Sequence, residues 1–264
     1  MKLEARAARS WAGGRPLELL RVLAVAEMRQ SRDLTLLGML KWVLEPLSYM
    51  AVYFVLVAAI FDRGREAYPL FLLAALVPFR YFTGVTTGAM GVVKSYGSVI
   101  TNAAMPMWVL PLVLMVSELA TLLLSLFVFV PFMIWYGVVP WPSVLWLPLL
   151  LVELMLLCSG PVYAATVFGL YVPHLRGASQ NLIRTTFFVS TGLVAAAEVP
   201  GNELAQLVRL NPLSSLFESF RAVFLHGSSP ALRDLLYLGA SGLLMLALGA
   251  AVFVWRQHEF PKEV

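Results

Sequence analysis

Long blocks of apolar residues dominate this sequence, and most of them are long enough to cross a lipid bilayer. Hydrophobic residues make up 60% of the 264 residues and charged residues only 13%, whereas soluble domains average about 45–50% and about 25%. This composition excludes a water-soluble fold. At about 20 residues per crossing, the chain has room for one integral membrane domain of roughly six helices. No separate soluble domain fits beside it.

The apolar blocks predict an all-α membrane fold with six transmembrane helices. We place them at residues 34–61, 67–93, 107–136, 144–170, 185–197 and 234–255. Pro78 and Arg80 interrupt the second block, so that helix is expected to be kinked or broken. The fifth block is marginal at 13 residues unless residues 181–184 extend it. Between the last two blocks, Asn211 and Pro212 separate two short apolar stretches, which predicts re-entrant or interfacial helices over 198–233.

The N-terminal region has a different character. Residues 1–15 are polar and basic, and residues 16–33 have apolar side chains on one side of a predicted helix and charged ones on the other. This pattern is typical of a helix that lies in the membrane interface, and a solvated helix packed on a partner is the alternative. We therefore divide the chain into 1–33, a tail with an interfacial helix, and 34–264, the membrane domain. The opening residues have no apolar core of the kind found in a cleavable signal peptide.

Basic residues predict the orientation of the chain. Seven of them precede the first block, whereas Arg63 and Arg65 in the following loop are offset by Asp62 and Glu66. The positive-inside rule then places the N-terminus in the cytoplasm, and six crossings return the C-terminus to that side. The connections 94–106 and 171–184 are also expected to face the cytoplasm, and 198–233 to face outward. An anionic membrane surface explains the net charge of +4 better than nucleic acid does.

Residues that could carry enzymatic chemistry are scattered. His174, His226 and His258 form no spaced ligand pair, so no metal site is predicted. The chain lacks the Gly-x-x-x-x-Gly-Lys-Ser/Thr loop that binds ATP phosphates, and we assign no catalytic residue. Cys158 is the single cysteine, so no intrachain disulfide can form. A membrane-embedded glycan or phospholipid transferase that uses scattered carboxylates remains an alternative.

Three carboxylates fall inside apolar blocks: Glu45, Glu118 and Glu153. A charge at membrane depth usually faces a protein interior or a wet cavity. Glu45 follows Lys41 by four residues, so the two could pair on one helix face. For Glu118 and Glu153 the alternatives are a wet pathway or a protonated carboxyl group that ties helices together, and the second is favoured.

Aromatic residues form the candidate lining of a transport path. Aromatic faces stack on the apolar C–H faces of sugars, so such a lining suits a glycan, although helix packing is the commoner role of such residues. Tyr49 and Tyr53 are four residues apart within one block, which a membrane-interface belt does not explain. The candidates are Trp42, Tyr49, Tyr53, Phe79, Tyr81, Phe82, Phe187 and Phe188.

The order of several short motifs resembles a known family. EMRQSRD precedes LLGMLKWVLEP, and then come FLLAALVPFRYFTGVTTG, ITNAAMPMWVLPL, SELA and VPGNELAQLVRLNPLSSLFESFRAVFLHG. From about residue 16 onward this order resembles the type-2 ABC exporter permeases of the polysaccharide branch, which export capsule, O-antigen and wall teichoic acid. LEP and the FLL…VPF stretch are most similar to the capsular members. The family often has a proline after a paired aromatic in the fifth helix, whereas here VSTGLVAAA, with Gly192, follows Phe187 and Phe188.

The resemblance implies a homodimer of permeases that works with two separate ATPase subunits, which bind the ATP and magnesium; no cofactor is expected in this chain. The implied cargo is a lipid-linked glycan, moved across the bacterial inner membrane. Exporters of drugs or lipids are the alternative within the same class. The ATPase contacts would lie on the interfacial helix and on a coupling helix at 94–106, and the outer gate at 198–226. The candidate coupling residues are Arg29, Arg32, Ser98, Ile100, Asn102, Ala103, Met105 and Pro106, and the candidate gate residues are Pro200, Asn211, Pro212 and Arg221.

Overall fold

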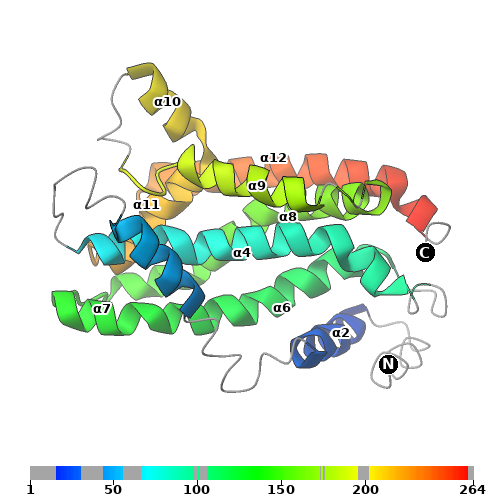
Figure 1. Ribbon diagram of the computed structural model, residues 1–264, viewed down its shortest axis with the longest axis horizontal. Helices are drawn as coiled ribbons and strands as arrows, with labels where there is room; N and C mark the ends of the chain where they lie inside the picture. Colours follow the sequence, from blue (N-terminus) through cyan, green and yellow to red (C-terminus); the bar gives the residue numbers. More distant parts are fainter. Residues whose placement is uncertain are drawn as a thin grey trace.

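The chain folds into a bundle of helices that run along one common axis (Figure 1). This computed structural model describes residues 16–30, 44–55, 67–97, 100, 106–172, 174, 176–195 and 202–260. Within these ranges the structure is helical, with turns and no β-strand. The all-α prediction is therefore confirmed for the described part of the chain.

Four segments are long and apolar enough to span a membrane among the residues that the structure describes. At about 1.5 Å per residue, each is longer than the ~30 Å hydrocarbon core of a bilayer. Their bounds confirm the predicted second, third, fourth and sixth crossings to within a few residues. They are α4 (Tyr68–Ser95), α6 with η2 and α7 (Val109–Ser125, Leu126–Val128, Phe129–Tyr136), η3 with α8 (Ser143–Trp146, Leu147–Tyr171), and α12 with η5 (Leu232–Arg256, Gln257–Glu259).

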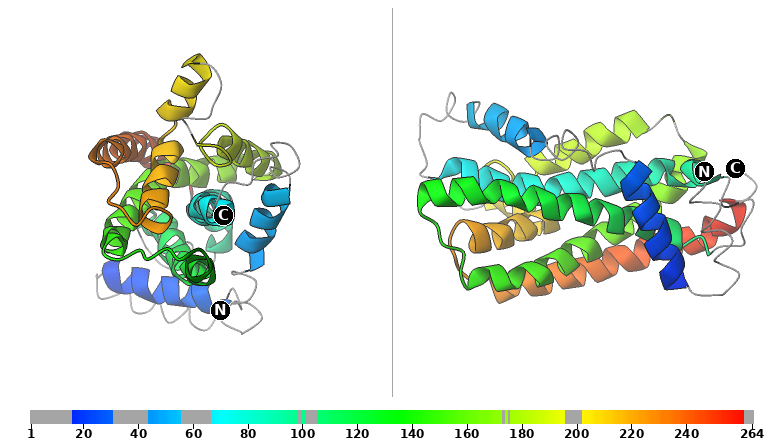
Figure 2. Two further views of the ribbon diagram at one scale, coloured as in Figure 1. Left: turned by 90° about the vertical axis from the view of Figure 1, so that its left-hand side faces the viewer. Right: turned by 90° about the horizontal axis from the view of Figure 1, so that it is seen from below.

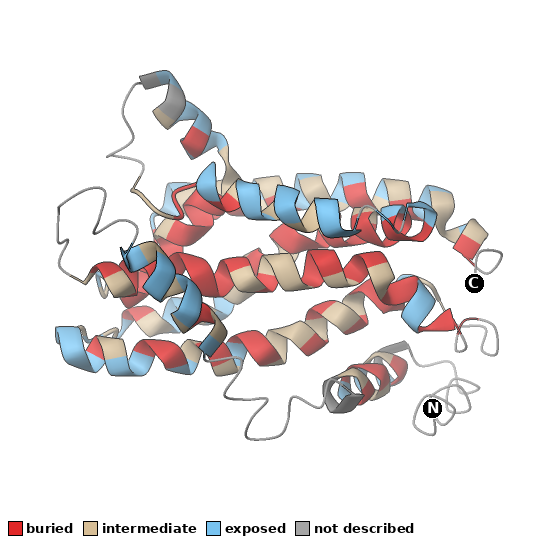
Figure 3. Cartoon of the chain, in the orientation of Figure 1, coloured by how far each residue is buried: buried red, intermediate tan, exposed pale blue. Residues whose placement is uncertain are grey.

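The second helix is continuous, which corrects the expectation of a break at Pro78. Helix α4 runs from Tyr68 to Ser95 with Pro78 inside it. Proline removes one intrahelical hydrogen bond, and burial of the flanking turns keeps the rest of the helix intact. In its most apolar window 78% of the residues are buried, and the end-on view in Figure 2 shows α4 surrounded by other helices. This helix is the centre of the core, as its mostly buried colouring shows (Figure 3).

Helices α4, α8 and α12 run in one direction and α6 with α7 runs in the other, so their connections lie at two ends of the bundle (Figure 1). Helix α2 (Pro16–Gln30), the end of α4, the start of α6, the end of α8 and the end of α12 lie at one end. The turn at 137–142 and the start of α12 lie at the other. Hereafter these are the α2 end and the far end. The predicted cytoplasmic connections thus share one end, and the side of the membrane that each end faces remains a prediction.

The remaining helices are short. The structure describes a helix over residues 44–55 within the predicted first crossing. Helix α9 (Arg176–Phe188) begins nine residues earlier than the predicted fifth block and includes only the first four residues of that block, 185–188. Two of its polar residues, Gln180 and Arg184, line a cavity described below. The count of six crossings therefore remains a prediction.

Two short helices follow where the sequence predicted them. Helix α10 (Asn202–Leu210) projects from the bundle, and α11 (Pro212–Phe224) packs into it beside α4 and α12 (Figures 1 and 2). Asn211 caps α11, since its side-chain oxygen accepts a hydrogen bond from the Leu213 backbone N–H at 3.0 Å. Pro212 occupies the first turn, where its missing N–H costs nothing. Whether the pair is re-entrant in a membrane stays a prediction.

Helices α8 and α12 pack with their backbones in contact. A Cβ atom placed on Gly249 of α12 would lie only 2.3 Å from the Gly160 carbonyl oxygen of α8. A Cβ on Gly160 would in turn lie 2.1 Å from the Met245 carbonyl oxygen. Such close approach through small residues is the usual way that helices associate in membranes. The opposite side of α12 is apolar and exposed, with Leu243 and Leu248 at 60% and 61% exposure, as expected of a surface that faces lipid.

Candidate transport cavity and gate region

A cavity of about 250 Å³ lies between the 44–55 helix, α4, α6 and α9. Its walls combine aromatic rings, hydroxyl and amide groups, and four charged side chains. Helix α4 supplies the longest wall, because residues 76, 79, 80, 83, 84 and 87 recur at helical spacing on one face. The lining residues are Glu45, Tyr49, Tyr53, Leu76, Phe79, Arg80, Thr83, Gly84, Thr87, Glu118, Gln180, Arg184 and Phe187.

Arg80 lies between two of the predicted intramembrane carboxylates. Its Nε donates a hydrogen bond to Glu45 Oε2 at 2.9 Å, and its Nη1 lies 4.0 Å from Glu118 Oε2. Gly84 leaves room for the Glu118 carboxylate, since a Cβ there would lie 3.4 Å from its Oε2. The side chains of Arg80, Glu45 and Glu118 are 20%, 35% and 30% exposed, so they reach the open part of the cavity. Lys41, the partner first expected for Glu45, lies outside the described residues.

Aromatic rings form the opposite part of the lining. The Tyr53 ring stacks on Phe187 with centroids 5.7 Å apart, and Phe79 contacts Phe187 at 4.9 Å. Phe188, which is 54% exposed, meets both Tyr53 and Phe187 edge-on at 6.0 Å. The rings of Tyr49, Tyr53, Phe79 and Phe187 join the 44–55 helix, α4 and α9 around one space, whereas Phe188 contacts Tyr53 and Phe187 and is not part of the lining.

The other aromatic candidates lie elsewhere. Tyr81 is 1% exposed and donates its hydroxyl hydrogen bond to the Met115 carbonyl of α6, so it packs two helices together and does not line the cavity. Tyr81 directly follows Arg80 in the sequence, and neighbouring residues of a helix point in different directions, so the Tyr81 side chain lies on a different face of α4. Phe82 packs partly buried beside Phe79 and is not part of the lining. Trp42 lies outside the described residues.

Glu153 lies apart from the cavity, on α8. It faces Gly239 of α12, where a Cβ would stand 3.5 Å from its Oε1. Its Oε2 is buried, and within the described part of the chain it has no hydrogen-bond partner. This placement between two packed helices is that of a carboxyl group inside a helix interface.

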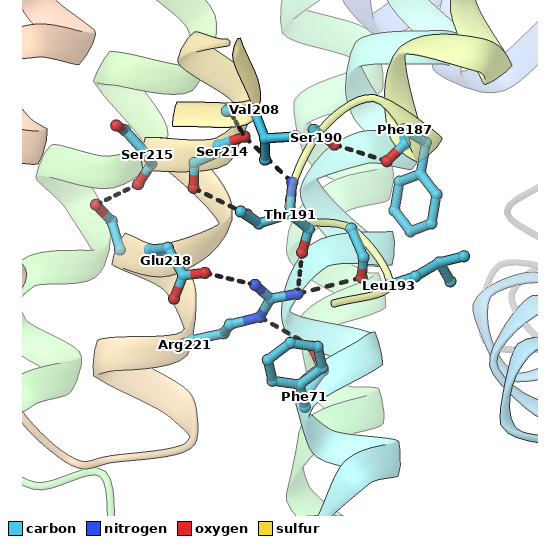
Figure 4. Close-up of polar contacts among 12 residues, drawn as sticks. Phe71, Phe187, Ser190, Thr191, Leu193, Val208, Ser214, Ser215, Glu218 and Arg221 are labelled. Atoms are coloured by element: carbon cyan, nitrogen blue, oxygen red, sulfur yellow. Dashed lines mark hydrogen bonds and ion pairs between the residues drawn. The ribbon is translucent and has the colours of Figure 1, made fainter. Parts of the chain in front are cut away.

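At the far end, Arg221 fixes α11 to its surroundings (Figure 4). This guanidinium is 1% exposed. Its Nη2 donates to the carbonyl oxygens of Thr191 at 2.5 Å and Gly192 at 3.1 Å, and its Nη1 bonds to Glu218 at 2.9 Å. Its Nε reaches the Phe71 carbonyl oxygen of α4 at 3.4 Å, and the guanidinium lies 3.5 Å from the centre of the Phe71 ring. One side chain thus holds α11, α4 and the turn after α9 together.

Ser214 strengthens the same junction. Its hydroxyl donates to the Val208 carbonyl of α10 at 2.6 Å and accepts from the Thr191 backbone N–H at 3.1 Å. Asn211 adds a bond from its Nδ2 to the Val189 carbonyl at 3.5 Å. Of the predicted gate residues, Asn211, Pro212 and Arg221 therefore lie together at the far end, and Pro200 lies outside the described residues.

Two of the predicted coupling residues are described. Ile100 is 6% exposed and belongs to an apolar cluster with Leu19 and Leu23 of α2. Tyr96 joins the same cluster and donates a hydrogen bond to the Glu27 carboxylate of α2. Pro106 precedes α6, to which α2 packs. The side chains of Arg29, Arg32, Ser98, Asn102, Ala103 and Met105 lie outside the described part.

Sequence reasoning missed the central cation of the cavity. Arg80 was read only as an interruption of a helix, and Thr83, Thr87, Gln180 and Arg184 were not selected. The available signal was a polar stripe at positions 80, 83, 84 and 87 of an otherwise apolar helix. Among the described residues, no group of three or more His, Cys, Asp or Glu side chains could hold a metal ion.

Comparison with known proteins gives a consistent result. No family model matches the chain. The chain is 25% identical over 247 residues to the O-antigen export system permease protein RfbA of Myxococcus xanthus, an alignment that covers 93% of this chain and 95% of the relative. Two proteins of the same name from Klebsiella pneumoniae are 23% and 22% identical over 245 residues, and each alignment covers 92% of this chain and 93% of the relative. The similarity therefore extends over nearly the whole chain, and it confirms the resemblance to the polysaccharide branch of type-2 ABC exporter permeases.

Proposed function

We propose that this chain is the membrane permease of an ATP-driven exporter that moves a lipid-linked polysaccharide, of the O-antigen or capsule type, outward across the bacterial inner membrane. The observation that carries this proposal is the similarity to O-antigen export permeases over 93% of the chain. A match of that extent includes the short helices and connections as well as the apolar spans. It therefore supports a transport subunit over an enzyme.

The chemistry of the cavity suits a carbohydrate. The rings of Tyr49, Tyr53 and Phe187 offer apolar faces for the C–H side of a sugar. Glu45, Glu118, Arg80 and Arg184 offer acceptors and donors for hydroxyl groups, and hydrogen bonds to charged groups are stronger than neutral ones. Because these charged groups are partly exposed, the hydroxyl groups of a passing sugar can replace the water bound to them, and the charged groups lose little solvation.

A second copy of the chain would complete the path. About 250 Å³ holds one sugar unit and not a polymer, so a single chain encloses too little space. The 44–55 helix and α9 border the cavity and have exposed apolar side chains, including Val55 at 65%, Leu182 at 71% and Phe188 at 54%. A homodimer that pairs these elements would bury this surface and join two cavities into one channel.

The energy would come from two partner ATPases that contact the α2 end. Helix α2 packs beside the end of α4 through Tyr96, Leu19 and Leu23. This places the predicted interfacial helix next to the predicted coupling connection, so one partner surface could contact both. Buried Ile100 would anchor the connection from within, while its neighbours in the sequence would meet the ATPase.

The test replaces Tyr49 and Tyr53 together with alanine. If these rings contact the cargo, the complex should assemble and hydrolyse ATP normally, while surface polysaccharide in cells decreases. A matched control replaces Phe127 and Trp135, which are 68% and 83% exposed on a surface away from the cavity, and should export normally. The measurements are the amount of dimeric protein in detergent, ATPase turnover with the partner encoded nearby, and surface glycan.

Normal export by the Tyr49 and Tyr53 variant would contradict the proposed lining. Loss of folded protein would instead show that the two rings serve packing, since removing a buried aromatic ring costs about 3–5 kcal/mol. Absence of any ATPase that assembles with the chain would contradict the wider proposal of ATP-driven export.

A further inference from the structure

A second cavity, of about 550 Å³, opens at the far end between α10, α11 and α12. Figure 1 shows these three helices meeting there, at the end of the bundle opposite α2. The lining is polar and differs from that of the transport cavity. It consists of Thr191, Gln206, Arg209, Leu210, Ser214, Ser215, Glu218, Arg233, Asp234 and Tyr237.

Two arginines from different helices give this cavity its charge. Arg209 of α10 and Arg233 of α12 are exposed, and neither has an acidic partner within 4.0 Å in the described part of the chain. The two lining carboxylates are already engaged. Glu218 bonds to Arg221 at 2.9 Å, and Asp234 accepts a hydrogen bond from the Ser215 hydroxyl at 3.1 Å.

The local charge is therefore positive. Arg221 balances Glu218, so Arg209 and Arg233 together exceed the single remaining carboxylate of Asp234 by one charge. Their planar guanidinium groups match the oxygen atoms of a phosphate, to which arginine can donate two parallel hydrogen bonds. The amide of Gln206 adds a further donor to the same walls.

Exposed leucines lie next to the lining residues along the sequences of α10 and α12, and Leu210 is itself part of the lining. Leu207 and Leu210 of α10 are 55% and 66% exposed, and Leu232 and Leu236 of α12 are 70% and 66% exposed. A polar cavity at the start of a spanning helix, bordered by exposed leucines, has the layout that a lipid requires: the headgroup enters the cavity and the acyl chains follow the apolar side of α12. A water-soluble phosphate would leave those leucines without a partner.

We propose that the cavity between α10, α11 and α12 binds the phosphate headgroup of an anionic phospholipid, with Arg209 and Arg233 as its two ligands. The bound lipid bridges α10 to α12, which otherwise meet where the Tyr237 hydroxyl bonds to the Leu210 carbonyl oxygen. The site is independent of the transport cavity and of the cargo proposed above. Phosphate is the recognised group, and the acyl chains distinguish a lipid from a soluble phosphate.

The test is native mass spectrometry of the purified full chain with phosphatidylglycerol and phosphatidylcholine of identical acyl chains. The wild type should retain phosphatidylglycerol in preference to phosphatidylcholine. The double variant Arg209→Gln/Arg233→Gln should bind it at least tenfold more weakly, which corresponds to about 1.4 kcal/mol. Arg21→Gln is the matched control, because Arg21 is exposed on α2 at the opposite end; it removes a basic residue of the predicted interfacial helix and should weaken the binding far less than the double variant does.

A second pair of experiments separates lipid from soluble phosphate and binding from folding. Glycerol 3-phosphate at millimolar concentration should fail to displace phosphatidylglycerol from the wild type; if it does displace the lipid, the lipid assignment is wrong. The charge-preserving Arg209→Lys/Arg233→Lys variant should keep the preference for phosphatidylglycerol. An unchanged preference in the glutamine variant, or equal loss in the lysine variant and the Arg21 control, would overturn the proposal.

Discussion

Replacing Arg221 with methionine tests the junction that fixes α11. Methionine retains much of the apolar volume of the side chain and removes every hydrogen bond of the guanidinium. The change leaves the buried carbonyl oxygens of Thr191 and Gly192 without the donors that now lie 2.5 Å and 3.1 Å away. It also removes the partner of Glu218 and the contact with the Phe71 ring.

The structure sets the size of the effect. An unsatisfied buried acceptor costs about 1–3 kcal/mol, and two carbonyls are affected. Glu218 is 36% exposed and can be hydrated, so its share is small. The two carbonyls together therefore set the expected loss of unfolding free energy at about 3–5 kcal/mol. At roughly 2–4 °C per kcal/mol for a chain near this size, the melting temperature should fall by roughly 6–20 °C.

The assay follows the monodisperse peak in gel filtration of detergent-purified protein after heating. The melting temperature of Arg221→Lys should lie between those of the wild type and Arg221→Met, because one ammonium group cannot reach all of the acceptors. Glu218→Gln, which changes the exposed partner only, should lower the melting temperature by no more than about 4 °C. If Arg221→Met melts within about 2 °C of wild type, the junction does not stabilise the fold and the reasoning above is wrong.

Four further predictions concern helix packing, transport, coupling and topology. Gly249→Ala should destabilise the protein by about 1–3 kcal/mol, because its Cβ would meet the Gly160 carbonyl at 2.3 Å, whereas Gly177→Ala, with open space around it, should be neutral or slightly stabilising in the same melting assay. Arg80→Leu should leave Glu45 and Glu118 facing one cavity without their shared cation, so export should fall more than protein abundance; equal losses of both would contradict a role in transport. Ala103→Asp should leave the permease inserted and abolish its stimulation of the partner ATPase, and normal stimulation would contradict the coupling assignment. Reporter fusions after residues 65, 140 and 228 should read outside and those after 104, 174 and 260 inside, and any reversal would contradict the six-crossing topology.

Local signals in the sequence predicted the elements that depend on local chemistry. Apolar block length gave four spanning segments with nearly correct ends, and the Asn211–Pro212 pair predicted the boundary between α10 and α11 because a side-chain cap and a proline act on the nearest backbone. Pro78 shows the limit of this reasoning. Its local effect is the loss of one hydrogen bond, and packing against the surrounding helices keeps α4 continuous.

Contacts between distant segments could not be read in the same way. The spacing of four residues suggested that Glu45 could pair with Lys41, which lies outside the described residues, but it gave no sign of the bond between Glu45 and Arg80, 35 residues away. Tyr81 was grouped with Phe79 and Phe82 as lining, and only the rotation of α4 within the bundle shows that it faces α6. Polar α9 was expected as a connection, because hydrophobicity alone does not reveal a helix that borders a cavity.

The direct backbone contact between α8 and α12 also restricts how this molecule can move. With no side chains between Gly160 and Gly249, neither helix can rotate or slide without a carbonyl oxygen colliding with the opposite backbone. The two helices therefore behave as one rigid wall. The 44–55 helix is joined to the bundle through side chains instead, with the Tyr53 ring stacked on Phe187 and Glu45 paired with Arg80, so we expect a displacement that widens a passage to arise there and not between α8 and α12.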